Sequence, residues 1–441
     1  MEQEKEKIRE RSGQDNDEKR LLLQKGKRGI LNLVFGRTML VVLMLVAQIL
    51  LLVQLFSSLQ SWLPYYYAFV LVLYGGLILH LVNKRSEPTT KITWILLIVL
   101  TPALGVALYT FVELDVGHRV LNRRLSQLMD ETARFLPSEP PQPEAMLESA
   151  PELEGLTRYA WQHGRYPVYG NTDVKYLSSG EASLEAMLED LRQARDFIFL
   201  EFFIIDEGTM WGRVLKILEE KVHEGVEVRV MYDGTCAIFR LPYRYPEMLK
   251  KLGIPCKMFA PIRPMISTHY NNRDHRKILV IDGKVAYTGG VNLADEYINI
   301  GSRFGQWKDV SIRLEGEGVR SFTLMFLQMW NISETGDAFA RYLETSNGAS
   351  DGLDAPGYVL PYGDSPLDDE RMGEMGYIDM LNRARRYVHI MTPYLILDAE
   401  MSAALDFAAK RGVEVVILLP HVPDKKYAFA LAKTQIGRAH V

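Results

Sequence analysis

Two long stretches without charge constrain this chain more than any other feature. No Asp, Glu, Lys or Arg occurs in residues 38–83, and after a short charged segment a second uncharged stretch covers residues 92–112. Such stretches are too long for the buried helices of a soluble domain, whereas a helix that crosses a bilayer needs about 20 apolar residues. We therefore predict three transmembrane helices within residues 38–112, at about 38–59, 64–82 and 92–112.

Positive charges beside these stretches set the expected orientation. Residues 1–37 form a basic tail, and the segment 84–91 carries two Lys and one Arg. Because Lys and Arg concentrate in cytoplasmic loops, both segments are placed in the cytoplasm, and three spans then put the chain after Glu113 outside it. Three Arg residues at 119–124 favour the opposite side. The expectation is a multi-pass protein of the cell membrane with an extracytoplasmic main domain.

The rest of the chain changes to alternating helices and strands. A Pro-rich segment within residues 113–155 is typical of a linker. Beyond it, apolar strand patterns at 197–205 and 226–232 each follow a helical pattern. This alternation predicts an α/β domain over residues 156–335.

The same order of elements recurs near the end of the chain. The segment that starts at Ala194 matches the one that starts at Ala384, an offset of 190, and Gly225 matches Gly412, an offset of 187. So small a drift predicts a duplicated α/β domain, with an incomplete second copy over residues 336–435. The last residues, 436–441, do not continue the repeat, and we interpret them as an artefactual tail.

The residues that can carry chemistry lie between the two repeats. The apolar segment 278–281 predicts a buried strand, and AspGlyLys after it predicts a tight turn into a returning strand. An imidazole and an ammonium precede this turn, two residues apart, and so share one face of an extended strand. A carboxylate, two glycines and an amide follow, and the full set is His275, Lys277, Asp282, Gly289, Gly290 and Asn292.

This set suits an anionic phosphodiester. An imidazole can attack phosphorus or protonate a leaving oxygen, and a lysine can hold the non-bridging oxygens. Glu201 and Asp233 are candidates to orient the histidine, or they face solvent. No metal site is expected, because the only cysteines, Cys236 and Cys256, cannot form a four-cysteine zinc site and no zinc-protease motif occurs. The alternative is a polar hairpin with a surface His and Lys.

On these residues the chain resembles the phospholipase D superfamily, whose signature is His-x-Lys-x4-Asp with GlyGly-x-Asn downstream. The apolar stretches before the motif narrow the resemblance to the bacterial cardiolipin synthases. Shorter blocks agree with it: ValMetTyrAspGly at 230–234, GlnTrpLysAspVal at 306–310 and ThrProTyr at 392–394.

The resemblance implies that two phosphatidylglycerols condense to cardiolipin and glycerol through a phosphatidyl-histidine intermediate, without any cofactor. It implies that His275 is the nucleophile or the general acid, that Lys277 and Asn292 hold phosphate, and that Asp282 supports the fold or the charge of the site. Gly289 and Gly290 would line the bound substrate. The expected partners are phosphatidylglycerol, other anionic phospholipids and the membrane, and nucleic acid is not expected.

Members of this superfamily carry two such motifs, and this chain has one. The offset of 187 places a second histidine near position 462, beyond Val441. We therefore expect a truncated copy that is inactive as written, unless a homodimer pairs two single motifs. Two alternatives stay open: a phospholipase D or phosphatidylserine synthase with the same site, and a non-catalytic membrane scaffold.

Overall fold

The computed structural model describes residues 37–58, 63–84, 88–113, 116–136, 143–242, 244–260, 273–301, 304–334, 339–345, 353–365 and 370–436. The described residues belong to two compact units, one built on the helices α3 to α6 and the other on the α/β domains. Each unit is considered by itself. Nearly all of the predicted basic tail and of the tail at 436–441 lies outside the described residues.

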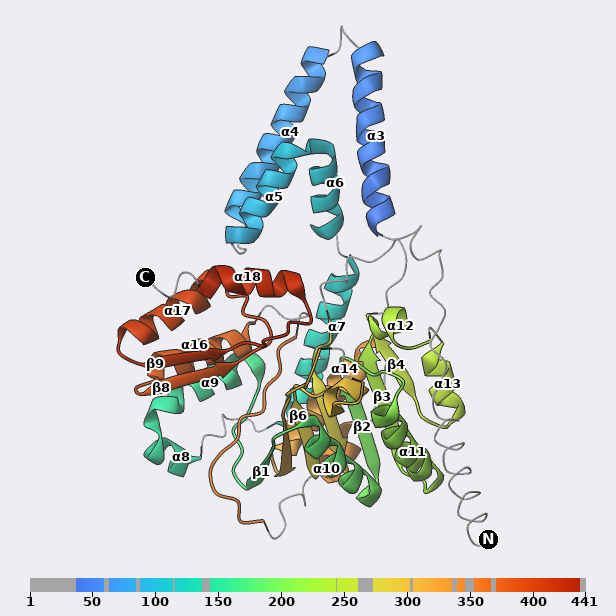
Figure 1. The fold of residues 1–441 in the computed structure, drawn as a ribbon, viewed down its shortest axis with the longest axis vertical. Coiled ribbons are helices and arrows are strands. Elements are labelled where there is room, and N and C mark those ends of the chain that lie inside the picture. Colours follow the sequence, from blue (N-terminus) through green and yellow to red (C-terminus); the bar gives the residue numbers. More distant parts are fainter. Residues whose placement is uncertain are drawn as a thin grey trace. The chain divides into compact units, whose positions relative to one another are not determined.

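The helical unit contains α3 (Arg37–Ser58), α4 (Leu63–Asn83), α5 (Pro88–Leu100) and α6 (Pro102–Glu113), shown in blue in Figure 1. The first two helices agree closely with the prediction. The prediction of one helix over 92–112 is wrong, because α5 ends at Leu100 and a second helix, α6, begins at Pro102. Proline has no N–H to donate within a continuous helix. Gly105 of α6 packs against α5, where a Cβ would lie 2.7 Å from the Cα of Ile98.

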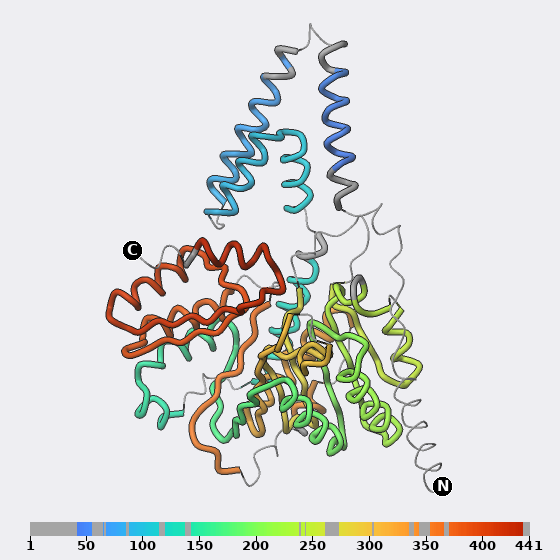
Figure 2. The backbone as a smooth tube through the Cα atoms, viewed as in Figure 1, coloured from blue at the N-terminus to red at the C-terminus, as the bar shows by residue number. Residues whose placement is uncertain are grey.

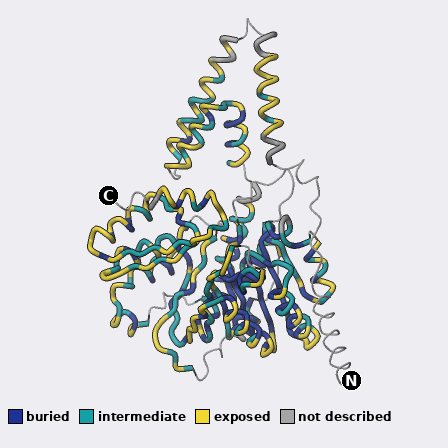
Figure 3. Tube along the Cα trace, in the orientation of Figure 1, coloured by how far each residue is buried: buried dark blue, intermediate teal, exposed yellow. Residues whose placement is uncertain are grey.

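Much of this unit is exposed (Figure 3). Its exposed apolar residues include Leu51 and Leu71, which have 60% and 74% of their surface accessible. Within the described part of the chain, no helix has the length and apolar character needed to cross a membrane. The transmembrane helices therefore remain a prediction.

The α/β unit is built on a mixed sheet of seven strands in the order β1-β7-β6-β5-β2-β3-β4. Strands β2, β3 and β4 pair in parallel, and the other neighbours pair antiparallel. The strands are β1 (Thr172–Leu177), β2 (Phe197–Phe202), β3 (Glu227–Asp233), β4 (Cys256–Phe259), β5 (Lys277–Ile281), β6 (Val285–Gly289) and β7 (Ser311–Gly316). The predicted α/β class is confirmed for this part of the chain.

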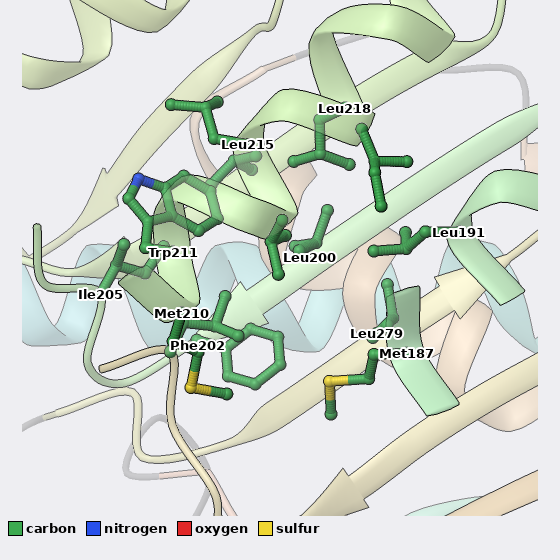
Figure 4. Packing of buried hydrophobic residues seen from close by; sticks show 14 of the residues in the cluster. Met187, Leu191, Leu200, Phe202, Ile205, Met210, Trp211, Leu215, Leu218 and Leu279 are labelled. Carbon is green, nitrogen blue, oxygen red and sulfur yellow. The ribbon is translucent and has the colours of Figure 1, made fainter. Parts of the chain in front are cut away.

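Helices cover both faces of this sheet. On one face α10 (Gly180–Gln193) and α11 (Thr209–His223) bury apolar side chains against Leu200 and Phe202 of β2 (Figure 4). On the other face α14 (Val319–Trp330) places Phe326 against Phe199, with ring centroids 4.6 Å apart. A strand buried on both sides needs apolar residues without alternation, which explains the continuous run in β2.

Shorter elements complete the first half of the chain and the connection to the second. The α-helices are α7 (Val116–Thr132), α8 (Glu144–Ser149), α9 (Glu154–Gly164), α12 (Cys236–Phe239), α13 (Tyr245–Lys251) and α15 (Phe339–Thr345). The described 3-10 helices are η1 (Ala133–Phe135), η2 (Pro151–Leu153), η4 (Asp295–Ile298) and η5 (Asn331–Ser333).

The predicted internal repeat is present in the structure. The second copy, red in Figure 2, contains α16 (Met372–Arg383), β8 (Tyr387–Met391), α17 (Ala399–Lys410), β9 (Glu414–Leu418) and α18 (Lys426–Ile436). Phe197 lies opposite Glu227 in the parallel pair of β2 and β3, and Tyr387 lies opposite Glu414 in the pair of β8 and β9. Phe197 and Tyr387 are 190 residues apart and Glu227 and Glu414 are 187 apart, which are the two offsets found in the sequence. Gly225 and Gly412, which begin the turns into β3 and β9, both have φ +89°.

Candidate active site

A tight hairpin positions the motif. The backbone N–H of Lys284 donates to the oxygen of Ile281 at 3.0 Å, and the two residues between them, Asp282 and Gly283, have φ of 52° and 64°. Positive φ at both central positions defines the type I′ turn that matches the twist of antiparallel strands. The predicted strand, turn and returning strand are therefore confirmed.

His275 and Lys277 lie together at the start of β5. The Nζ atom of Lys277 is 3.2 Å from Nδ1 of His275 and donates to the backbone oxygen of His275 at 2.7 Å. Phe203, just after β2, places its ring centroid 4.6 Å from that of the imidazole and 5.4 Å from the amine. Lys277 is buried, whereas the imidazole of His275 is partly enclosed by the protein and partly exposed to solvent. A substrate can therefore reach the imidazole, with the amine beside it.

Burial and charge shift both groups. Burial, aided by the charges of Lys277 and Lys425, lowers the pKa of His275 to about 4. Burial lowers the pKa of Lys277 to about 8, although the carboxylates of Asp274 and Asp309 oppose this shift. At neutral pH the pair is therefore a neutral imidazole beside a mainly charged amine, and Lys425 brings a charge from the second repeat toward the same histidine.

The pair opens into a cavity of about 670 Å³, a size typical of small-molecule sites. One wall is basic and comes from the motif region, with Arg273, His275, Arg276 and Lys277. Gly289 and Gly290 line the cavity beside them, and their contact with substrate stays a prediction. A Cβ at Gly289 would lie 2.5 Å from the oxygen of Val310, and one at Gly290 would overlap the carboxylate of Asp309.

Asp282, grouped with the catalytic residues in the sequence analysis, lies away from His275. Its carboxylate accepts three backbone N–H bonds, from Arg195 and Asp196 at 2.8 Å and from Phe197 at 2.9 Å. These bonds join the end of β5 to the start of β2. At about 3.3 Å per residue, β5 separates Asp282 from Lys277 by about 16 Å. A catalytic role for Asp282 is not supported, whereas the alternative of support for the fold agrees with this geometry.

Asn292 is likewise held by the protein. Its Oδ1 accepts from the N–H of Ile204 at 2.9 Å, and its Nδ2 donates to the hydroxyl of Tyr297 at 2.7 Å. The residue is 2% exposed. Asn292 thus ties together the segments that follow β2 and β6, and a contact with phosphate stays a prediction.

Glu201 belongs to a buried group of two acids and one cation. The Nε of Arg276 donates to Oε1 of Glu201 at 2.6 Å and lies 3.6 Å from Oδ1 of Asp274. Burial raises the pKa of both acids, and the charge of Asp274 adds to the rise at Glu201, whereas the charge of Arg276 opposes the rise at both. Glu201 therefore acts on the motif through Arg276 and not by contact with His275.

Asp233 fixes the residues that enter the motif. It accepts from the backbone N–H of Asp274 at 3.1 Å and from Arg273 at 3.3 Å, and it also caps its own loop through the N–H of Thr235 at 2.9 Å. The carboxylate is fully buried. Asp233 does not face solvent, and it holds the backbone directly before His275. That it orients the histidine stays a prediction.

Sequence reasoning missed several residues of the site. Phe203 and Arg276 carry no separate motif, although both are next to residues that were singled out. Asp309 matched the family without a role. It is close enough to Lys277 for their charges to interact, and burial raises its pKa. The glycine at position 290 is the signal that could have indicated Asp309, because the carboxylate of Asp309 occupies the space that a side chain at position 290 would need.

Possible metal ligands and cysteine thiols were the other groups with potential for chemistry. In the part of the chain that the structure describes, no three His, Cys, Asp or Glu side chains converge as metal ligands. Both cysteines are unpaired, and burial raises the pKa of Cys236 to about 12. A thiol with so high a pKa stays protonated and is a poor nucleophile.

Comparisons with known proteins agree with the repeat and with the motif. The family described as cardiolipin synthase, PLD-like domain, matches residues 187–301 and 377–438, and the family described as phospholipase D-nuclease N-terminal matches residues 72–112. The chain is 31% identical to the cardiolipin synthase of Alkalihalophilus pseudofirmus over 85% of its own length and 75% of that protein.

Two further similarities were found. An uncharacterized protein of Streptococcus mutans is 51% identical over 81% of this chain and 77% of its own length. The crystal structure of the phosphatidylserine synthase of Haemophilus influenzae aligns with a TM-score of 0.43 at 14% identity, over 65% of this chain and 72% of that one.

Proposed function

Because this chain belongs to the cardiolipin synthase family of the phospholipase D superfamily, we propose that it transfers a phosphatidyl group between two phosphatidylglycerols. The products are cardiolipin and glycerol. The observation that carries this proposal is the pair of His275 and Lys277 at the basic wall of the cavity, where a neutral imidazole lies 3.2 Å from an amine.

In the first step His275 is the nucleophile. A ring nitrogen uses its lone pair to form a bond to phosphorus, the bond from phosphorus to the glycerol oxygen breaks, and that oxygen leaves as glycerol after it takes a proton from a general acid. The lowered pKa of His275 favours this role over that of the acid, because a group with a pKa of about 4 is mostly unprotonated at neutral pH.

In the second step the hydroxyl of another phosphatidylglycerol gives its proton to the group that protonated glycerol in the first step, and its oxygen bonds to phosphorus. The bond between phosphorus and nitrogen breaks, and the imidazole regains its lone pair. Throughout, the charge of Lys277 stabilises the non-bridging oxygens. The two steps as written involve no metal and no nucleotide.

The general acid would be a second histidine of the same kind. The described second repeat supplies a strand pair, β8 and β9, that matches β2 and β3 of the first repeat. A substrate whose leaving group needs no proton therefore isolates the part of the reaction that His275 performs alone.

The test uses a phosphatidyl p-nitrophenyl ester in detergent micelles with the purified chain. Since p-nitrophenolate leaves without protonation, we expect a burst of p-nitrophenolate close to one equivalent per protein and a protein adduct that carries the lipid. His275→Ala should lose both, whereas His223→Ala, an exposed histidine on α11, should keep both. An equal burst in His275→Ala would refute the role of His275, because another group would then perform the attack. The absence of a burst in the unsubstituted protein would favour a scaffold.

Acceptor choice needs a second measurement. Trapped phosphatidyl-protein is chased with phosphatidylglycerol, with serine or in water alone, and the lipid product is identified. Cardiolipin as the main product supports the synthase. Phosphatidic acid in the presence of phosphatidylglycerol would indicate a phospholipase D, and phosphatidylserine would indicate a phosphatidylserine synthase.

We also propose that residues 38–112 attach the protein to the cell membrane with the α/β unit outside the cytoplasm. Exposed leucines on α3 and α4 and the N-terminal family match over residues 72–112 support the attachment. Retention in the membrane fraction after alkaline carbonate extraction would test it. A reporter fused after Pro137 that is active only in the cytoplasm tests the side, and activity of this reporter would reverse the orientation.

A further inference from the structure

The cavity at His275 has a second wall of opposite character. It is formed by residues within 362–365 and 370–374, and its lining includes three carboxylates and one guanidinium: Asp364, Glu370, Glu374 and Arg371. The basic wall accounts for the phosphodiester of a phospholipid. The carboxylates have no function in the two-step reaction described above.

Hydrogen bonds hold the described residues of the second wall. Both oxygens of Asp364 accept from the N–H of Gly373, at 2.9 and 3.0 Å, which joins the two described parts of this wall. The hydroxyl of Tyr166 donates to the oxygen of Gly363 at 2.7 Å. A Cβ at Gly363 would lie 3.7 Å from Nη1 of Arg276, so this wall begins beside the cation of the basic wall.

The carboxylates of this wall are suited to accept hydrogen bonds. An ionised carboxylate has about four acceptor positions, and the backbone N–H of Gly373 contacts one position on each oxygen of Asp364. Glu370 accepts from the hydroxyl of Tyr159, and Glu374 pairs with Arg371 at 3.0 Å. The wall therefore offers acceptors within the same cavity as His275, on a well-supported segment.

The charges nearby favour hydroxyl donors over an ammonium group. Arg371 stands among the carboxylates, and three further cations, Arg273, Arg276 and Lys277, line the same cavity. An ammonium headgroup would be repelled by these cations at short range. A hydroxyl donates to a carboxylate without bringing charge, and a diol can donate twice.

We propose that Asp364 and Glu374, with Glu370 beside them, recognise the hydroxyls of a polyol headgroup whose phosphodiester lies at His275 and Lys277. This inference rests on the proposed function and adds the part of the substrate that it leaves unassigned. The basic wall selects the phosphodiester, and the acidic wall selects glycerol as its substituent.

The experiment measures competition against the p-nitrophenolate burst. The competitors are lysophosphatidylglycerol and lysophosphatidylpropanol, which have the same phosphodiester charge and differ in the headgroup hydroxyls. A hydrogen bond to a charged group is worth roughly a tenfold change in affinity or more. We expect the glycerol compound to inhibit at a concentration about 10-fold lower than the propanol compound.

Substitutions in the acidic wall test whether this wall causes the preference for the glycerol compound. Asp364→Asn keeps an oxygen for the N–H of Gly373, and Glu374→Gln keeps the shape of the side chain. Each should reduce the preference for glycerol severalfold while inhibition by the propanol compound is unchanged. Glu220→Gln, an exposed residue on α11, is the matched control and should retain the full preference.

The outcomes separate the two proposals. A burst that depends on His275 but shows equal inhibition by both competitors, or a preference that survives both substitutions, overturns the inference and leaves the proposed function standing. Stronger inhibition by lysophosphatidylethanolamine than by the glycerol compound would also overturn it, in favour of a cationic headgroup. The absence of any burst that depends on His275 would remove the proposed function itself.

Discussion

The side-chain amine of Lys277 lies 3.2 Å from Nδ1 of His275 and donates to the backbone oxygen of the same residue. Each group needs a different protonation state in the proposed reaction, neutral for the imidazole and charged for the amine. Burial lowers the pKa of both, to about 4 and about 8, so the two states coexist in a window around neutral pH.

The pH dependence of kcat/KM for the burst should follow this window. Below about 4, protonation of His275 removes the nucleophile, and above about 8, loss of the proton from Lys277 removes the cation that holds phosphate. We expect a bell-shaped profile with these limbs. Lys277→Arg should abolish the upper limb, because Arg stays charged. A profile whose upper limb is the same in both proteins would show that another group titrates there.

Asp309 should control the position of the upper limb. Its negative charge raises the pKa of Lys277 against the effect of burial. Asp309→Asn removes that charge, so the limb should move to lower pH while the lower limb, set by His275, moves less. The rates are measured across pH beside those of Asp173→Asn, a charge change on the exposed part of β1. An upper limb that stays in place would exclude an electrostatic role for Asp309.

Loss of the Asp282 carboxylate should unfold the protein more easily. Asp282→Ala leaves three backbone N–H groups without their acceptor, and unsatisfied buried donors cost about 1–3 kcal/mol each. We expect a loss of about 3 kcal/mol or more in urea unfolding, followed by the fluorescence of the buried Trp211. Asp282→Asn, which keeps part of these bonds, should lie in between, and Asp196→Ala serves as the control. If Asp282→Ala kept its stability but lost the burst, Asp282 would have a role in catalysis.

The buried acids at Arg276 make stability depend on pH. Burial raises the pKa of Glu201, so the folded protein keeps a proton that the unfolded chain releases. Stability is therefore complete below the ordinary pKa of Glu and declines as pH rises toward the raised value. Glu201→Gln should flatten this decline in urea unfolding at several pH values, at a cost of about 1 kcal/mol near neutral pH.

Arg276→Met provides the contrast to that substitution. It leaves two buried carboxyls without their cation, and breaking a buried ion pair costs about 3–5 kcal/mol. We expect this variant to be the least stable of the group at every pH. Equal losses for Glu201→Gln and Arg276→Met would mean that Glu201 is ionised in the folded protein.

Local patterns predicted much of the fold. The apolar run of β2, the turn at Asp282 and Gly283, and the offsets between the repeats depend on neighbours in sequence, and the structure confirms all three. The hairpin of α5 and α6 was missed because apolar length was given more weight than Pro102. A proline breaks a helix whatever the polarity around it.

The site was harder to predict, because its walls come from distant segments. His275 and Lys277 are neighbours in sequence and were found together. The contact of Phe203 with His275 and the space of Gly290 filled by Asp309 depend on how strands pair across the sheet. The acidic wall at Asp364 and Glu374 has no motif, since its carboxylates matter only through the cavity they share with His275.

The bonds of Asp282 to the start of β2 change the meaning of the motif. Lys277 begins β5 and Asp282 follows its last residue, so the four residues between them measure the length of one strand. Asp282 fixes one end of β5 to the start of β2, and Lys277 presents its amine at the other end of the strand. An inserted residue between them would reverse the faces of half the strand, so the spacing would be kept for mechanical reasons even in a protein that had lost its chemistry.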